Sequence, residues 1–506
     1  MVTLREATPP GPVEGGRTFD SLDPASGSVV GTFPVAGDDD VRRAVDRAAE
    51  AAVWWRSLGF GGRQRHLGAW RSTVARRIHE LADLITRENG KPHPDAVLEI
   101  TTALDHLGWA AGHARRVLGP RPVFPGLLAL NNSASVEYQP LGVVGVIGPW
   151  NYPVFTPFGS IAYALAAGNA VVFKPSEFTP AIGSWLVDAW RESVPDGPDV
   201  LTLVTGFGET GAALCRAGVD KVAFTGSAAT GRRVMAACAE NLVPVLMECG
   251  GKDALIVDDD ADLSAAADAA LWGGMSNGGQ TCIGIERVYA TEPVYDRFVA
   301  ILTERAGRLR PGSGPDAAWG PPTMPSQLDV IRRHVADALE RGGRAVVGGM
   351  DGVRPEGVEA TVLVDVPEDS DAVRDETFGP TLTVTRVRDA DEAVDRANDS
   401  RYGLGGAVFT RSRSRGVALA RRLRSGMTSV NSVITFASVP GLPFGGVGES
   451  GFGRIHGPDG LREFTRAKAI TAQRFALPVD MLSFNRPDRA ADVLASFIRT
   501  VYGRRG

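Results

Sequence analysis

The sequence predicts an α/β protein with helices on both faces of parallel sheets. Short β-branched runs such as VVGVI (143–147) and AVVFK (170–174) lack polar alternation, and segments long enough for helices separate them. A strand that is apolar on both faces is typical of a parallel sheet covered by helices. Because 506 residues exceed the size of one hydrophobic core, we expect about two or three domains.

Two helical regions come before these strands. Apolar residues recur at helical spacing over 38–89, and the segment 94–118 has the same period. A passage rich in proline and glycine follows and ends in an alternating stretch at 133–139. This pattern predicts extended structure that projects from a core.

The first predicted sheet carries polar or glycine-rich loops after its strands. The strands are VVGVI (143–147), AVVFK (170–174), VLTLV (200–204) and KVAFT (221–225), with helices at 157–167 and 180–194, and they lead into GPWNYP, KPSE, TGFG and GSAATG. A doubly wound sheet binds its ligand at these carboxyl ends, where glycines before a helix let backbone N–H groups approach a phosphate. Together the loops predict a dinucleotide site, with Lys174 on ribose or adenine and Glu177 on a ribose 2′-hydroxyl.

A second α/β unit begins at ALIVDDD (254–260). It continues with a helical stretch (261–275), the turn GGQTC (278–282) and the run ERVYA (286–290). Beyond it, the runs AVVGG, TVLVDV, TLTVTRV and AVFT alternate with helical segments at 294–309, 326–341, 390–398 and 413–423. Cys282 therefore lies near the start of this unit and Glu248 at the junction of the two units, where ligand clefts are frequent.

Composition argues against several classes of protein. With 54 basic and 59 acidic residues and no basic block, we expect a small-molecule partner and no nucleic acid. No run approaches the roughly 18 apolar residues of a spanning helix and no targeting pattern is visible, so we predict a cytoplasmic protein. The cysteines, which are Cys215, Cys238, Cys249 and Cys282, show no metal spacing and are too sparse for a disulfide framework. We expect no metal site and reduced thiols, of which one is free to react.

Seven motifs occur in a fixed order along the chain. They are GPWNYP, KPSE, FTGSAATG, MECGGKD, GGQTC, DETFGP and PFGGVGESGFGR. From about residue 20 to about residue 475 the chain thereby resembles the aldehyde dehydrogenase superfamily, and GPWNYP and GGVG are similar to its class 3 branch. The resemblance implies a Rossmann-like NAD(P)-binding domain (1–118 and 141–248), an α/β catalytic domain (249–440), a small β-strand oligomerisation arm (119–140 and 465–476) and a C-terminal tail (477–506).

The same resemblance implies the catalytic residues. It makes Cys282 the nucleophile, Glu248 the general base and Asn151 an oxyanion donor. A thiolate attacks an aldehyde to give a thiohemiacetal, whose alkoxide requires hydrogen-bond donors. Loss of hydride leaves a thioester, and a carboxylate with a raised pKa activates the water that hydrolyses it. The activity implied is NAD(P)-dependent oxidation of an aldehyde to the carboxylic acid.

Cofactor and substrate contacts follow from the same motif positions. We expect a preference for NAD, because Glu177 repels a 2′-phosphate, although the class 3 branch tolerates NADP as well. The cofactor contacts implied are Trp150, Lys174, Ser176, Glu177, Gly206, Phe224, Gly226, Ser227, Gly231, Gly250, Glu376 and Phe378. The substrate pocket implied consists of Trp109, Tyr152, Phe155, Phe158, Ile283 and Phe436, which favours an apolar aliphatic or aromatic aldehyde. Arg115, Arg116 and Arg287 keep a semialdehyde acid open, since its carboxylate needs a buried arginine.

Two other functions stay open at this point. A CoA-acylating reductase uses the same fold and cysteine, but such enzymes generally lack the base that Glu248 provides. A non-catalytic binding or structural protein is disfavoured by the intact set of Cys282, Glu248 and Asn151.

Two segments of the chain predict assembly. The resemblance implies that 133–139 and 468–474 pair as an arm against a partner subunit, so we expect a homodimer or homotetramer. In the tail, one helical face carries Val493, Leu494, Phe497, Ile498 and Val501, with arginines around it. We expect this face to dock on protein rather than to bind an anionic membrane.

Overall fold

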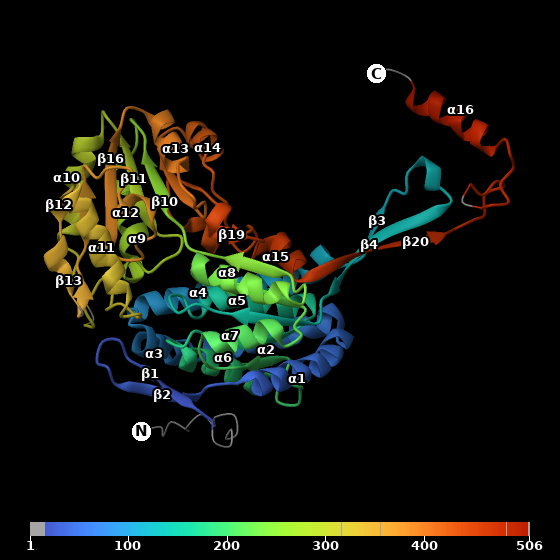
Figure 1. Cartoon of the computed structure of the whole chain (residues 1–506), viewed down its shortest axis with the longest axis horizontal. Coiled ribbons are helices and arrows are strands. Elements are labelled where there is room, and N and C mark those ends of the chain that lie inside the picture. Colours follow the sequence, from blue (N-terminus) through green and yellow to red (C-terminus); the bar gives the residue numbers. More distant parts are fainter. Residues whose placement is uncertain (1–15, 315, 355, 482, 504–506) are drawn as a thin grey trace. The chain divides into compact units, whose positions relative to one another are not determined.

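Two compact units make up the chain. The computed structural model describes residues 16–314, 316–354, 356–481 and 483–503. The main unit comprises Met1–Val117 and Pro140–Thr465, and the arm unit comprises Leu118–Gln139 and Arg466–Gly506. The main unit holds two largely parallel sheets with helices on both faces, which confirms the predicted α/β fold (Figure 1).

The helical region predicted at 38–89 consists of three helices, and a longer helix follows it. They are α1 (Asp38–Ser57), α2 (Gly59–Arg76), α3 (Ile78–Asn89) and α4 (His93–Leu118). Three aspartates stand in the first turn of α1, where carboxylates stabilise the helix dipole. The chain has positive φ at Gly59 (φ 60°), the first residue of α2, and at Gly90 (φ 82°), the C-cap of α3.

The first sheet has six strands in the order β19-β9-β8-β5-β6-β7. The strands are β5 (Val143–Ile147), β6 (Ala170–Lys174), β7 (Leu201–Leu203), β8 (Lys221–Thr225), β9 (Val245–Glu248) and β19 (Gly451–Phe452). Every pair is parallel except β19 with β9. One face is covered by α1, α7 (Gly208–Arg216) and α8 (Ala228–Ala239), and the other by α5 (Phe155–Ala167) and α6 (Pro180–Ser193).

The strand order of this sheet reverses at β5. The chain passes from β5 to β6 and β7 on one side and then returns to β8 and β9 on the other. Such a reversal opens a crevice at the carboxyl ends of the central strands. Asn151 follows β5, Gly226 follows β8 and Glu248 ends β9, so three neighbouring strands bring these residues to one edge.

The second sheet has seven strands in the order β12-β15-β16-β11-β10-β17-β18, and only β12 runs antiparallel to its neighbour. The strands are β10 (Asp253–Val257), β11 (Ile285–Thr291), β12 (Arg344–Val347), β15 (Thr361–Val364), β16 (Thr381–Val387), β17 (Gly406–Phe409) and β18 (Ser429–Val430). Helices α9 (Leu263–Met275) and α10 (Tyr295–Ala306) cover one face, and α13 (Ala390–Asn398) and α14 (Arg413–Ala420) cover the other (Figure 1). Cys282 lies just before the amino end of β11.

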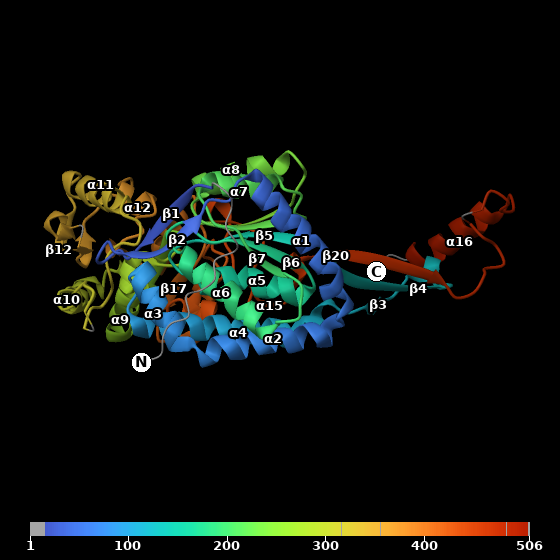
Figure 2. The same ribbon diagram turned by 90° about the horizontal axis from the view of Figure 1, so that it is seen from below.

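Further elements complete the main unit. They are β1 (Thr18–Leu22), β2 (Val29–Pro34), β13 (Val353–Arg354), β14 (Gly357–Val358), α11 (Gln327–Glu340), α12 (Asp371–Arg374), α15 (Gly457–Glu463), η2 (Ser276–Gly279), η3 (Met350–Gly352), η4 (Thr435–Ser438) and η5 (Gly448–Ser450). The antiparallel pair β1–β2 lies against α6 (Figure 2).

The arm unit is a small sheet with a terminal helix. Its elements are β3 (Arg121–Val123), η1 (Leu127–Ala129), β4 (Asn132–Pro140), β20 (Thr465–Gln473) and α16 (Ala490–Tyr502), with β4 between β20 and β3. The predicted arm segments 133–139 and 468–474 therefore lie side by side within one chain. In the described ranges, no helix combines the length and apolar content needed to cross a membrane.

Candidate active site

A cavity in the main unit is lined by strand ends of the first sheet and by loops that flank the second sheet. It has an empty volume of about 1180 Å³ including its mouth, and Cys282 and Glu248 both line it. Glu248 comes from the carboxyl end of β9, and Cys282 from the loop before β11. The cavity thus lies where the crevice of the first sheet meets the amino ends of the second.

A left-handed turn presents Cys282. After α9, Asn277, Gly278 and Gly279 all adopt positive φ, with values of 54°, 65° and 73°. A Cβ on Gly279 would lie 2.0 Å from the carbonyl oxygen of Gly379, so only glycine fits there. The glycines of GGQTC are therefore needed to reverse the chain, and the Cys282 side chain stays accessible from the cavity. Burial raises the pKa of its thiol, and nearby carboxylates raise it further.

Glu248 is a buried carboxyl group without a partner. Its side chain is 3 % exposed, and neither carboxylate oxygen has a hydrogen-bond partner among the described residues. Burial raises its pKa well above the usual value, and the guanidinium of Arg454 offsets this only in part. A Cβ on Gly445 would lie 2.8 Å from Oε1, so the glycine leaves room for the carboxyl group. Such a group can hold a proton near neutral pH and release it.

Asn151 lies beside the loop that carries Cys282. Its Nδ2 donates to the carbonyl oxygen of Gln280 at 2.9 Å, two residues before the cysteine. The neighbouring Tyr152 hydroxyl lies 3.0 Å from Oγ1 of Thr281. The loop after β5 and the cysteine loop are therefore joined by side-chain hydrogen bonds, although they are far apart in the sequence.

Lys91 and Glu99 were missed by the sequence analysis. They form an ion pair with both side chains 1 % exposed or less. Lys91 Nζ donates to the carbonyl oxygen of Asn151 at 3.1 Å, and Glu99 accepts from the backbone N–H groups of Val154 and Phe155. The helical periodicity could have indicated that Glu99 is buried, because Glu99 falls on the face of α4 that also carries the buried residues Ala96, Ala103 and Leu107.

The predicted phosphate and ribose contacts lie at the carboxyl ends of β6, β7 and β8. Ser227 caps α8 by accepting from the N–H of Thr230, which leaves the other first-turn N–H groups available to an anion. A Cβ on Gly226 would lie 2.7 Å from the Phe224 ring. At β6, burial lowers the pKa of Lys174, whose Nζ is 3.0 Å from the carbonyl oxygen of Pro175 and 3.9 Å from Glu177. Ser176 contacts the same carboxylate at 3.4 Å, and Gly206 follows β7 with φ 144°.

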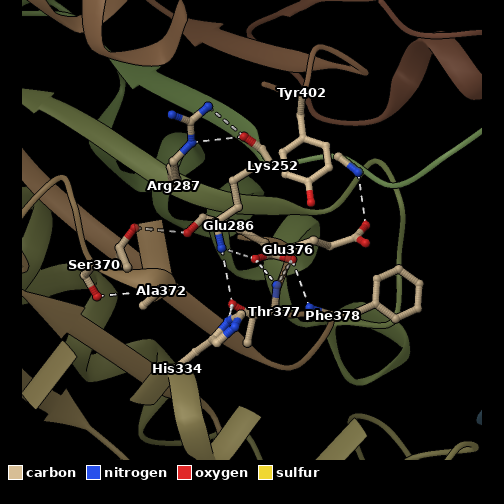
Figure 3. A network of polar contacts seen from close by, with 12 residues as sticks. Lys252, Glu286, Arg287, His334, Ser370, Ala372, Glu376, Thr377, Phe378 and Tyr402 are labelled. Atoms are coloured by element: carbon tan, nitrogen blue, oxygen red, sulfur yellow. Dashed lines mark hydrogen bonds and ion pairs between the residues drawn. The ribbon is translucent and has the colours of Figure 1, made fainter. Parts of the chain in front are cut away.

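A polar network holds Glu376 and Phe378 (Figure 3). Lys252 pairs with Glu286, which accepts from the backbone N–H groups of Thr377 and Phe378 at 2.8 and 3.0 Å. Glu376 accepts from the N–H of Gly251 at 3.0 Å, and burial raises its pKa to about 8. A Cβ on Gly250 would lie 2.2 Å from the carboxylate oxygens of Glu376, so the glycine leaves room for this carboxylate. The Trp150 and Phe378 rings meet edge to face at 5.5 Å.

These donors and acceptors fit a dinucleotide. Glycine-lined backbone at a helix N-terminus suits phosphates, and the buried Lys174 and the half-buried Glu376 offer polar atoms to ribose hydroxyls. At Gly231 the space is less restricted, since a Cβ there would lie 3.3 Å from Sγ of Cys249.

Half of the predicted substrate-pocket residues line the cavity. Tyr152, Phe155 and Ile283 do, whereas Trp109, Phe158 and Phe436 do not. Phe158 is fully buried in the core against Trp70, with ring centroids 4.7 Å apart.

The other two residues outside the cavity, Trp109 and Phe436, contact other parts of the main unit. Trp109 stacks on His113 along α4, about 10 Å of helix beyond Thr102, the last residue of α4 at the cavity. The Phe436 ring lies near Gly405 instead.

The three arginines considered for a carboxylate do not line the cavity either. Arg115 and Arg116 are exposed on α4. Arg287 is buried, but it donates to the carbonyl oxygens of Lys252 and Ala397 and so fixes backbone. The position of an arginine on a helix or strand does not reveal what its side chain contacts, because these contacts depend on which loops pack nearby.

Comparisons with known proteins agree with this architecture. Two parallel sheets with a cavity at their strand ends are typical of α/β enzymes. The profile of the aldehyde dehydrogenase family matches residues 12–470. The chain therefore belongs to the aldehyde dehydrogenase family, and it is an enzyme that oxidises an aldehyde group. Members of this family use NAD(P).

Individual relatives cover most of the chain. The 4,4′-diapolycopene aldehyde oxidase of Methylomonas sp. is 35% identical over 490 residues, which are 96% of this chain and 92% of the relative. The glutarate-semialdehyde dehydrogenase of Pseudomonas aeruginosa is 36% identical over 467 residues, covering 90% and 94%. The crystal structure of PnpE in complex with nicotinamide adenine dinucleotide has a TM-score of 0.87 at 32% identity and covers 93% and 97%.

Proposed function

We propose that Cys282 is the nucleophile, Glu248 the general base and Asn151 an oxyanion donor of this aldehyde dehydrogenase. The observation that carries the proposal is the cavity shared by an accessible thiol and a buried carboxyl group without a partner. Asn151 supports it, because its amide group is hydrogen-bonded to the loop of the cysteine. Glu248 ends strand β9 of the first sheet and Cys282 lies in the loop before strand β11 of the second, and both line the same cavity.

The residues perform the reaction in two halves. Cys282 reacts as the thiolate, after its thiol has released its proton to water: Sγ bonds to the aldehyde carbon, the C=O π electrons move to the oxygen, and the alkoxide formed accepts hydrogen bonds from Asn151 Nδ2 and the backbone N–H of Cys282. NAD(P)⁺, when bound, supplies the acceptor for the hydride that this carbon loses. Glu248 then takes a proton from water, which attacks the resulting thioester, releases the Cys282 thiolate and gives the carboxylic acid.

For the cofactor we propose NAD over NADP. Glu177 stands after β6 as the acid that accepts a ribose 2′-hydroxyl in dinucleotide sites, and its charge repels a 2′-phosphate. Its carboxylate lies 3.9 Å from Nζ of Lys174, which softens the repulsion and makes the preference mild. The remaining contacts proposed for the dinucleotide are Trp150, Ser176, Gly206, Phe224, Gly226, Ser227, Gly231, Gly250, Glu376 and Phe378.

For the substrate we propose an apolar aldehyde. The cavity wall is largely apolar and includes Leu98, Phe155, Trp272, Ile283, Val433, Ile434, Phe444 and Ile455. Among the described residues that line it, the cations are limited to Lys91, which Glu99 neutralises, and Asp95 adds negative charge. A substrate carboxylate would therefore meet no free cation there, which favours a substrate like that named for the Methylomonas relative. A semialdehyde, as named for the Pseudomonas relative, is the second candidate.

One panel of substrates tests these assignments. Purified protein is mixed with NAD or NADP and with octanal, benzaldehyde or glutarate semialdehyde, in the presence and absence of CoA. We expect NADH and free acid, with kcat/KM highest for octanal or benzaldehyde. Cys282→Ala should abolish NADH production while NAD binding, followed by fluorescence, stays nearly unchanged. NADH formation by this variant would overturn the choice of nucleophile.

We also propose that the protein is a homo-oligomer and that its domains have separate functions. Residues 1–118 and 141–248 bind the cofactor, 249–440 carry the nucleophile, and 119–140 with 465–476 contact a partner subunit. Within the arm unit, Phe124, Leu128 and Phe475 are 71, 60 and 55% exposed in the single chain. Exposed apolar side chains of this size often mark a surface that contacts another protein. Light scattering at micromolar concentration should report at least a dimer.

A further inference from the structure

We propose that Asn277 is a positioning residue that holds Asn151 in place for catalysis. The inference rests on the role proposed above for Asn151. Asn277 lies in the left-handed turn before Cys282, and its side chain is 4 % exposed. Its Nδ2 donates to the carbonyl oxygen of Asn151 at 3.0 Å and contacts the carbonyl oxygen of Gln280 at 3.3 Å.

The contacts form a closed ring between two loops. Asn151 Nδ2 donates to the same Gln280 carbonyl oxygen that Asn277 contacts, and Asn277 Nδ2 also donates to the Asn151 carbonyl oxygen. Both ends of Asn151, its carbonyl oxygen and its side-chain amide, are thereby fixed. One N–H of its amide is used by Gln280, so the other N–H has a defined direction.

Further contacts fix the ring itself. The Gln280 side chain donates to the carbonyl oxygen of Asn277 at 2.9 Å and accepts from the N–H of Thr323 at 3.0 Å. Lys91 provides a second donor to the Asn151 carbonyl oxygen. An oxyanion donor is effective when its direction is set before the charge develops, because no reorganisation is then needed during the reaction.

The residue type at 277 matches this role. A left-handed conformation disfavours most side chains, and asparagine and glycine tolerate it best. Glycine would satisfy the backbone as the next two positions do, so the backbone alone does not require a side chain here. The amide of Asn277 therefore serves the contact between the loops.

Two variants separate the amide from the backbone. Asn277→Gly keeps the left-handed turn and removes the donor, whereas Asn277→Asp keeps the size and faces two carbonyl oxygens with a carboxylate. We expect the pre-steady-state rate of NADH formation to fall by about 10- to 100-fold in both, since loss of one oxyanion donor typically costs about 100- to 1000-fold. Asp365→Gly is the control. Asp365 also has positive φ, and its replacement by glycine removes two hydrogen bonds that Arg344 donates to its carboxylate. It should keep the wild-type rate.

A double-mutant cycle shows whether Asn277 acts through Asn151. If it does, adding Asn277→Gly to Asn151→Ala should slow NADH formation by less than about 3-fold further. The rate of Cys282 alkylation by iodoacetamide and the thermal midpoint of each variant report whether the cysteine loop is intact. We expect alkylation of Asn277→Gly within about 3-fold of wild type.

Several results would overturn the inference. They are a wild-type burst rate in both Asn277 variants, full multiplication of the two effects in the cycle, or a loss of alkylation as large as the loss of rate. If Asn277→Gly does not fold, Asn277→Asp alone decides by the same criteria. A wild-type rate in Asn151→Ala would instead contradict the oxyanion donor of the proposed function.

Discussion

At the scale of single residues, burial decides what Glu248 can do. A carboxyl group that meets water is ionised at neutral pH, whereas one without partners in an apolar wall keeps its proton more strongly. The pKa of Glu248 is raised for this reason. Burial also raises the pKa of the Cys282 thiol. Both groups are therefore protonated to a larger extent in the resting site than they would be in water.

Substitution of the base separates the two halves of the reaction. Glu248→Gln should keep a first-turnover burst of NADH, because Cys282 still accepts the aldehyde, and lose steady-state turnover by about 100-fold or more. Rapid mixing with absorbance detection measures both phases. If burst and turnover disappear together, Glu248 also serves the acylation half.

The raised pKa predicts a direction for the pH dependence. The ionised form of Glu248 accepts the proton from water, so kcat should rise with pH, and the midpoint should lie well above the usual 4.5 of a glutamate. The residual kcat of Glu248→Gln should lack this ionisation. A wild-type kcat that is already constant at pH 5 would show that the carboxylate is not the limiting base.

Glu177 is expected to set the cofactor preference. Glu177→Gln removes a charge whose interaction with a phosphate is worth about 1 kcal/mol through water, which is about five-fold in affinity. The ratio of kcat/KM for NAD to that for NADP should fall by this factor. Glu304→Gln, on the surface of α10, should leave the ratio unchanged. An unchanged ratio in Glu177→Gln would place the discrimination elsewhere.

At the scale of elements, Glu99, one partner of a buried ion pair, joins α4 to the N-terminus of α5. Glu99 of α4 accepts from the first N–H groups of α5, and Lys91 joins Glu99 to the loop of Asn151. One helix is therefore tied both to the N-terminus of the next and to the proposed site. A buried pair of this kind is sensitive to the loss of one partner, because the other charge is then buried alone.

Removal of one partner should destabilise the fold more than removal of both charges. Lys91→Met should lower the free energy of unfolding by about 3–5 kcal/mol. Lys91→Met with Glu99→Gln should recover much of this, because glutamine still accepts from Val154 and Phe155 without a charge. Urea unfolding followed by tryptophan fluorescence measures the difference. A double variant as unstable as the single one would show that the charge itself is required.

At the scale of the whole molecule, helix α16 of the arm unit exposes apolar side chains that we expect the assembled protein to cover. Helix α16 has the predicted amphipathic form, and its apolar side chains Val493, Phe497 and Val501 remain 68, 42 and 37% exposed. Exposed apolar stripes of this kind are usually covered by protein or by a membrane surface.

A charge on this stripe should disturb assembly. Phe497→Asp should weaken the oligomer in light scattering over a dilution series, whereas Ser496→Asp, on the opposite side of α16, should not. Little protein should pellet with anionic liposomes. Strong liposome binding that Phe497→Asp removes, with oligomer size unchanged, would mean that the stripe binds membrane instead.

The sequence by itself determined the α/β class and most elements, because buried strands and amphipathic helices are local patterns that each segment must satisfy. It also indicated Cys282, Glu248 and Asn151 as the proposed catalytic residues, since ordered motifs carry them. The tertiary structure decided what no local pattern contains. It placed Trp109, Phe158 and Phe436 outside the cavity and joined Lys91, Asn277 and Asn151, because such contacts depend on how loops from distant strands pack together.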